Sequence, residues 1–111
     1  MRILFTILVA LLAGCATIEE SNQRTVDISV AGGELIFRGP LDEANVSTAI
    51  ALAEQSSAPI HTLRITSDGG DVFSGMDFGY WIHRHQLKLI VEDICFSSCA
   101  NYLFTARGRE N

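Results

Sequence analysis

Residues 62–71 have the sequence TLRITSDGGD, in which a short apolar strand, residues 62–66, runs directly into a turn that contains Gly69 and Gly70. A helix is expected next, over roughly residues 72–85. Two glycines between a buried strand and a helix let the backbone approach a ligand closely and point its N–H groups outward. The stretch therefore predicts a parallel-sheet unit with a ligand crevice at the carboxyl end of its strand.

Strands and helices alternate on both sides of this stretch. Before it, residues 25–37 alternate apolar and polar positions around a Gly-Gly turn, which predicts a hairpin, and residues 42–55 predict a helix. After it, residues 87–92 (LKLIVE) predict another buried strand, and residues 100–106 predict a final helix. This order implies right-handed crossover connections, so the expected fold class is α/β with a mainly parallel sheet and crossover helices.

The N-terminus has the layout of a secretory signal. One basic residue, Arg2, precedes an apolar run over residues 3–13, and small residues then lead to Cys15. This run of 11 residues is too short to cross the hydrocarbon core of a bilayer, which takes about 20 residues in a helix. We therefore expect the segment to be removed after export.

The residues Leu12-Ala13-Gly14-Cys15 resemble the bacterial lipobox. The resemblance implies that residues 1–14 are a lipoprotein signal peptide, that the Cys15 thiol receives a diacylglycerol, and that the new amine is acylated, with palmitate as a typical chain. Two or three acyl chains anchor a protein durably. The alternative is an ordinary cleaved signal in which Cys15 is incidental.

The lipobox resemblance also carries an expectation about location. Ala16 after the cysteine is similar to the sorting signal for the outer membrane of Gram-negative cells, so we expect an extracytoplasmic protein that faces the periplasm there. Residues 15–24 are then the lipid-anchored tether, since they are polar and lack periodicity. The expected membrane partner is the bilayer itself, bound through Cys15.

Length and charge limit what the exported part can be. Without residues 1–14 the chain has 97 residues, which suits one small domain over residues 25–111. Loss of Arg2 changes the formal net charge from −5 to −6. A basic nucleic-acid footprint is absent, so we expect no nucleic-acid partner, and the sequence indicates no cofactor.

Two further segments carry a second resemblance. They are ITSDGGDVFSG at residues 65–75 and ICFSSCANYLFTARG at residues 94–108. Together they resemble the proteolytic subunit of Clp protease and the wider Clp/crotonase superfamily, and most closely its exported members with a Cys-x-Ser-x-Cys signature. Residues 67–70 match the family's glycine turn, and Gly75 matches the glycine of the following helix.

The site residues follow from this resemblance. Ser98 matches the nucleophile, and the backbone N–H groups of Gly70 and Cys99 would form the oxyanion hole that holds a tetrahedral intermediate. The implied substrate is a peptide or protein. Ser98 lies 28 residues after Gly70, so two adjacent parallel strands could deliver both features to one edge of the sheet.

The resemblance covers about residues 25–109 but only the first part of the family's domain, so the Clp/crotonase-like fold is expected to be incomplete at its C-terminal end. In the family the catalytic His lies some two dozen residues after the serine and the Asp later still, whereas 13 residues follow Ser98. We expect no serine-hydrolase turnover, because an unactivated serine is a poor nucleophile. A non-catalytic binding or assembly module, such as a homo-oligomer subunit, is the alternative; a crotonase-like acyl-CoA enzyme is less favoured, because CoA is not expected outside the cytoplasm.

Simpler roles compete for the polar candidates. Ser97 and Ser98 could cap the last helix. The histidines at positions 61, 83 and 85 favour surface or satisfied side chains over bases or metal ligands. Asp68 and Asp71 favour a solvated turn and a helix N-cap over a cation site. No metal site is therefore expected.

The cysteines and aromatic residues also leave alternatives. Cys95 and Cys99 could form a disulfide in an oxidising compartment or remain two buried thiols, since two cysteines in one straight helix rarely meet disulfide geometry. A zinc site is not indicated by two ligands alone. Six aromatic residues are expected in the core and interfaces; they are Phe73, Phe78, Tyr80, Trp81, Tyr102 and Phe104.

Overall fold

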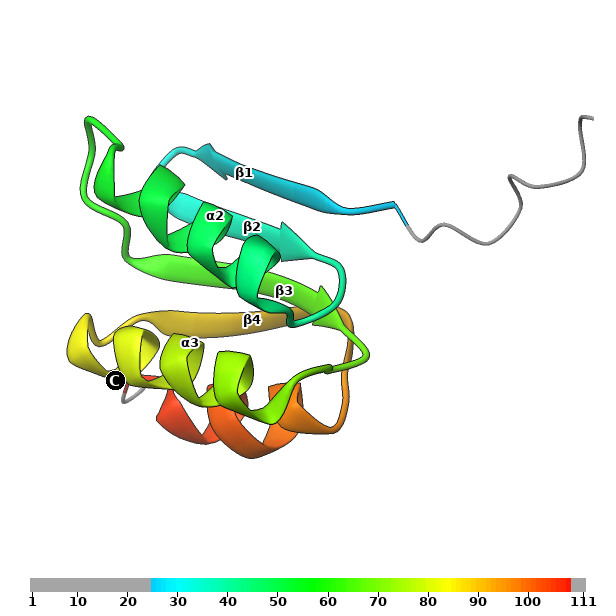
Figure 1. The fold of residues 1–111 in the computed structure, drawn as a ribbon. Helices are drawn as coiled ribbons and strands as arrows, with labels where there is room; N and C mark the ends of the chain where they lie inside the picture. The colour runs from blue at the N-terminus through cyan, green and yellow to red at the C-terminus, as the bar shows by residue number, and fades with distance from the viewer. Residues whose placement is uncertain (1–24, 109–111) are drawn as a thin grey trace, which may run out of the picture.

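The computed structural model describes residues 25–108 as a small α/β domain with a four-stranded mixed sheet (Figure 1). The predicted signal peptide, residues 1–14, and the lipid-acceptor Cys15 with its tether lie outside the described residues. Within residues 25–108, no helix is both long and apolar enough to cross a membrane.

The sheet has the order β1-β2-β3-β4. Its strands are β1 (Asp27–Ala31), β2 (Glu34–Arg38), β3 (Thr62–Ser67) and β4 (Lys88–Cys95). The first pair is antiparallel and the other two pairs are parallel, so the predicted hairpin and the parallel pairing of the later strands are both present. Gly32 and Gly33 have φ of 58° and 79°, which fits the two positive φ values of a type I′ hairpin turn.

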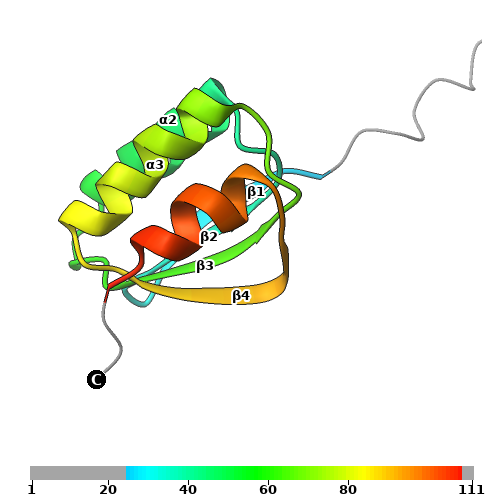
Figure 2. The same ribbon diagram turned by 90° about the horizontal axis from the view of Figure 1, so that it is seen from below.

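Two α-helices connect the parallel strands, α2 (Glu43–Glu54) and α3 (Val72–Arg84). Each begins at an aspartate N-cap, because the carboxylate of Asp42 accepts from the Asn45 N–H and that of Asp71 accepts from the Ser74 N–H. Figure 2 shows both helices and the last helical segment on one side of the sheet. Right-handed crossovers along a sheet that grows in one direction place helices on one face.

The core lies between the sheet and these helices. Alternate residues of β2 and β3 point into it. The largest fully buried side chains come from the sheet, from α3, from the last helical segment and from the chain next to the strands. They include Phe37, Phe78, Leu35, Leu41, Leu63, Ile65, Ile82, Leu87 and Leu103. Phe37 and Phe78 pack with ring centroids 5.4 Å apart.

The opposite face of the sheet is polar. Arg38 pairs with Asp27 at 2.5 Å and with Glu92 at 3.0 Å, and Arg64 pairs with Glu34 at 3.1 Å. The hydrogen bonds from Arg64 hold the pKa of Glu34 below its usual value. These charged side chains are partly exposed, so this face of the sheet is solvated and the ion pairs contribute little to the free energy of unfolding.

Two predicted boundaries were wrong. The strand expected over residues 87–92 continues to Cys95, with Glu92 and Asp93 exposed on the last strand of the sheet, where charged side chains are tolerated. The helix expected over residues 100–106 begins one residue earlier and is irregular, with a π-helical turn η2 (Cys99–Leu103) and a 3₁₀ turn η3 (Phe104–Ala106).

The aromatic residues divide between the core and the surface. Phe78 and Trp81 are buried, as predicted for the core. Phe73, Tyr80 and Phe104 are exposed instead, so they do not belong to the core of residues 25–108.

Candidate functional site

The glycine turn after β3 and the serine turn after β4 lie against each other. Ser67, the last residue of β3, pairs with Cys95, and its carbonyl accepts from the Phe96 N–H at 3.0 Å. A Cβ atom at Gly69 would lie 2.7 Å from the Phe96 carbonyl oxygen and 2.8 Å from Ser97 Cβ. Gly69 also has φ of 98°, so both the backbone conformation and the contact require glycine.

Ser98 is buried at the junction of the two turns. Its side chain makes no capping hydrogen bond, so capping of the last helix by Ser98 is wrong. The Ser98 hydroxyl instead donates to the Gly70 carbonyl at 3.5 Å, and the residue is 2% exposed. This distance is at the long limit for a hydrogen bond, so the hydroxyl is held weakly.

Of the two N–H groups predicted for an oxyanion hole, that of Cys99 is already engaged in a hydrogen bond. Gly70 presents its carbonyl to Ser98, and the Cys99 N–H donates to the Phe96 carbonyl at 3.0 Å. A Cβ atom at Gly70 would lie 2.5 Å from the Leu41 carbonyl oxygen, which fixes this glycine against the chain that follows β2. Stabilisation of an oxyanion by Cys99 would require the hydrogen bond to Phe96 to open.

A disulfide joins Cys95 and Cys99, with Cα atoms 5.2 Å apart. The objection that both cysteines belong to one straight helix does not apply, because Cys95 ends β4 and Cys99 begins the π-helical turn. The bond closes a five-residue ring that contains Ser97 and Ser98. Ser97 has φ of 55°, which is uncommon for a residue with a side chain, so the ring holds the serine turn in a restricted conformation.

The last helical segment packs on α3 across two glycines. A Cβ atom at Gly75 would lie 3.0 Å from Ser98 Cβ, and one at Gly79 would lie 2.3 Å from the Tyr102 carbonyl oxygen. The segment that carries Ser98 therefore approaches α3 where α3 has no side chain. Gly79 was missed from the sequence, although its spacing of four residues from Gly75 is a signal of close helix contact.

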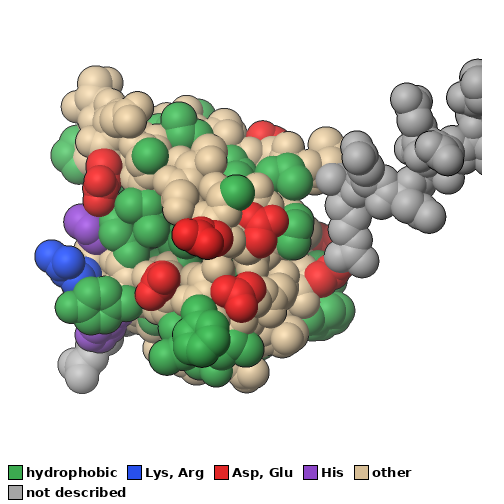
Figure 3. Space-filling view, viewed as in Figure 1, with side chains coloured by type: hydrophobic (Ala, Val, Ile, Leu, Met, Phe, Trp, Pro, Cys, Tyr) green, Lys and Arg blue, Asp and Glu red, His purple; other side chains and the backbone are tan. Residues whose placement is uncertain are grey.

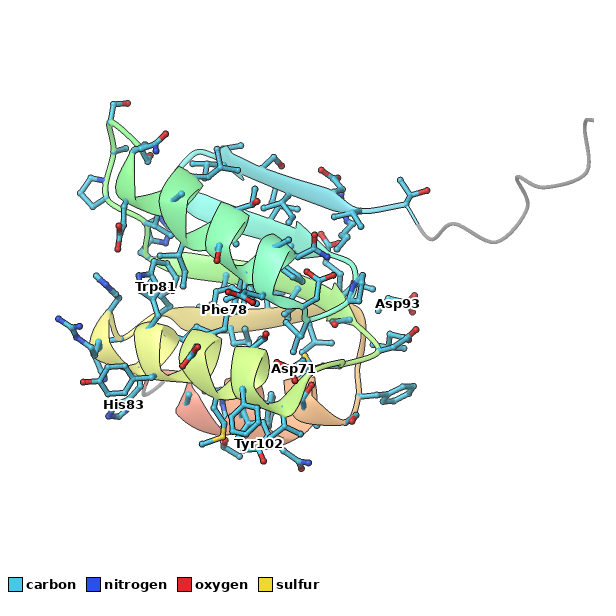
Figure 4. The ribbon with its side chains drawn as sticks, viewed as in Figure 1. Asp71, Phe78, Trp81, His83, Asp93 and Tyr102 are labelled. Atoms are coloured by element: carbon cyan, nitrogen blue, oxygen red, sulfur yellow. A yellow bond between two sulfur atoms is a disulfide. The ribbon has the colours of Figure 1, made fainter. Side chains whose placement is uncertain are left out.

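All three histidines of the chain are exposed and lie away from Ser98. His61 precedes β3, at the amino end of the strands, whereas Ser98 follows the carboxyl end of β4. His83 and His85 lie at the C-terminal end of α3, which spans about 20 Å over 13 residues. Figure 4 shows His83 at the opposite end of α3 from Asp71, so no histidine is placed to take a proton from Ser98.

Of the two acidic residues beside the glycines, Asp71 has a structural role as the N-cap of α3. The Asp71 carboxylate accepts from the Ser74 N–H at 2.9 Å and from the Ser74 hydroxyl at 2.8 Å. These bonds lower the pKa of Asp71. Asp68 lies half-buried in the turn. Within residues 25–108 no three side chains of His, Cys, Asp or Glu form a group that could hold a metal ion.

Comparison of the chain with protein-family models, with curated proteins and with solved structures found no match. The site is therefore defined by its own geometry: a serine turn closed by a disulfide, set against a glycine turn at the carboxyl end of two parallel strands. The relationship to the Clp/crotonase superfamily stays a prediction.

Proposed function

We propose that this chain is an exported, lipid-anchored domain that presents the nucleophile half of a Clp-type serine peptidase site. The lipobox-like residues ending at Cys15 support the membrane tether. The position of Ser98 beside Gly70, with its hydroxyl 3.5 Å from the Gly70 carbonyl, is the observation that carries the peptidase-like part.

The chemistry of that half-site is incomplete in the described residues. A serine hydroxyl attacks a carbonyl efficiently only when a base within hydrogen-bond reach takes its proton. The histidines lie at the other end of the domain. The Ser98 hydroxyl makes only a long hydrogen bond, to the Gly70 backbone carbonyl. Hydrolysis of a peptide or protein substrate by a serine–histidine pair at Ser98 would therefore need a histidine supplied from outside residues 25–108.

A non-catalytic binding or assembly module on the same scaffold is the second candidate, and one surface favours it. Phe73, Met76 and Tyr80 follow one face of α3 and are 74%, 48% and 66% exposed. Figure 3 shows hydrophobic side chains in separate groups along α3, with acidic side chains between them. Several exposed large apolar side chains on one face of a helix are typical of interaction surfaces.

Turnover tests whether Ser98 is inert, as the incomplete half-site requires. The full chain is solubilised in detergent, and hydrolysis of a 4-nitrophenyl ester is followed for the wild type, Ser98→Ala and Ser97→Gly; Ser97→Gly removes the neighbouring hydroxyl at a position whose positive φ suits glycine. We expect equal background rates for all three. A wild-type rate that is lost in Ser98→Ala alone would contradict the inert half-site.

Self-association tests the second candidate in the same samples. Sedimentation of the wild type is compared with that of a Phe73→Ser, Tyr80→Ser double variant, which removes the two most exposed of these side chains. A homo-oligomer that the double variant dissociates would support assembly through α3. A wild type that stays monomeric would argue against a homo-oligomer subunit.

A further inference from the structure

A cavity lies at the end of the domain opposite Ser98. It has a volume of about 320 Å³ and opens between the last turn of α2, residues 56–60, and the C-terminal end of α3. Its walls include Ile60, Trp81, His85 and Leu87. Ile60 and Leu87 precede the amino ends of β3 and β4, whereas the serine turn follows the carboxyl end of β4, so the cavity is separate from the serine turn.

Trp81 gives this cavity a specific chemical feature. Trp81 is 9% exposed, and its Nε1 is the one buried side-chain polar atom among residues 25–108 that has no hydrogen-bond partner. Buried indole N–H groups usually find a partner, and an unpaired buried donor destabilises the folded state. An acceptor that reached this atom would remove that cost.

The rest of the wall favours a flat apolar group. The rings of Trp81 and His85 lie with centroids 4.8 Å apart at an interplanar angle of 45°, and Pro59, Ile60 and Leu87 add apolar surface. The volume lies at the small end of the range for ligand pockets, about 300–1,000 Å³. The cavity therefore suits a single ring with a short substituent.

We propose that this cavity is a binding site for a small planar molecule that carries a carbonyl oxygen, with its ring against Trp81 and His85 and its oxygen accepting from Trp81 Nε1. Nε1 is covered in this structure, so the hydrogen bond requires a neighbouring side chain to move aside and open a path from the cavity to this atom. Nothing in this site depends on the chemistry of Ser98.

The chain contains one tryptophan, so its indole N–H gives a single NMR signal that reports on the cavity. The full chain, anchored in lipid nanodiscs and grown with isotope-labelled tryptophan, is titrated with acetophenone and with ethylbenzene. The two probes have similar size and shape, and only acetophenone has the carbonyl. Free probe concentrations are taken from their own signals, which corrects for partition into lipid.

We expect acetophenone to shift the indole signal saturably and to bind about fivefold more tightly than ethylbenzene, the factor that one net hydrogen bond gives. Trp81→Phe keeps an aromatic ring without the donor, and saturation-transfer signals should show acetophenone binding there as weakly as ethylbenzene. Asp77→Asn, on the exposed face of the same helix, is the matched control and should bind like the wild type.

Two results would overturn the proposal. The first is an indole signal that neither probe shifts saturably, which would mean that the cavity binds no such ligand. The second is equal affinity of the wild type for both probes, which would mean that the Trp81 donor has no part in recognition. Both results come from the wild type alone, so the test does not depend on whether Trp81→Phe folds.

Discussion

Replacement of Gly79 by alanine tests the close contact that positions the serine-bearing segment. The new Cβ atom would lie 2.3 Å from the Tyr102 carbonyl oxygen and 3.1 Å from its carbonyl carbon. Real Cβ atoms essentially never approach closer than 3.0 Å, so the backbone at Tyr102 must retreat by at least 0.7 Å, the difference between these distances. Backbone cannot rotate away as a side chain can.

The expected magnitude is the balance of two effects. Alanine is favoured over glycine within a helix by about 1 kcal/mol, whereas overpacking a close contact costs about 1–3 kcal/mol. Because the clash is with backbone, we take the upper end and expect Gly79→Ala to lower the free energy of unfolding by about 2 kcal/mol. For a domain of this size this lowers Tm by about 8–16 °C.

Gly75→Ala is the matched control. Its Cβ atom would meet Ser98 Cβ at 3.0 Å and Tyr102 Cδ2 at 3.3 Å, contacts that a shift of a few tenths of an ångström and a small rotation of the Tyr102 ring relieve. We expect its stability to lie within about 1 kcal/mol of the wild type, since the gain in helix propensity offsets the tighter contact. Thermal unfolding followed by circular dichroism measures both variants. A Gly79→Ala protein as stable as the wild type would refute the packing argument.

Three further predictions concern the covalent and capping interactions. Reduction of the Cys95–Cys99 disulfide, or the double change to serine, should lower the free energy of unfolding by about 2 kcal/mol, the loop-entropy value for a five-residue ring; urea unfolding with no loss would contradict this. The folded-state pKa of Asp71 is lowered by its hydrogen bonds to Ser74, so its carboxylate stabilises the fold at neutral pH, and this contribution disappears as the pH falls below 3.8. The Tm difference between the wild type and Asp71→Asn should therefore shrink in acid. A Tm difference that grows in acid would show that the direction of the pH dependence is wrong. Labelled fatty acid should enter the wild type and not Cys15→Ser in bacterial cells, and equal labelling of both would exclude lipidation at Cys15.

Local sequence signals were sufficient for most of the secondary structure. Asp42 and Asp71 each precede a helix as an N-cap, and the Gly32-Gly33 pair forms the hairpin turn. These features depend on a few neighbouring residues, so the sequence alone could predict them. The end of β4 could not be predicted this way, because Glu92 and Asp93 argue against a buried strand and only the pairing of Ser67 with Cys95 extends it.

The site depended on contacts between distant segments. The resemblance placed Ser98 after a strand and near the glycine turn, and the structure brings the two turns together. The resemblance could not indicate that the Gly70 carbonyl accepts from the Ser98 hydroxyl, or that the Cys99 N–H already donates to the Phe96 carbonyl. Both depend on the backbone conformation of the turns. The cavity at Trp81 joins residues from two helices, a loop and the start of β4, and no local pattern marks it.

The central claim is that Ser98 occupies a nucleophile position but has no histidine placed to act as its base. Covalent capture by a fluorophosphonate probe tests it most directly, because the probe labels only serines whose hydroxyl is activated. The full chain in detergent is treated beside Ser98→Ala and Ser97→Gly, and labelling at each serine is read by mass spectrometry. We predict no labelling at Ser98 above background; strong labelling of the wild type and of Ser97→Gly that disappears in Ser98→Ala would show an activated serine and contradict the account.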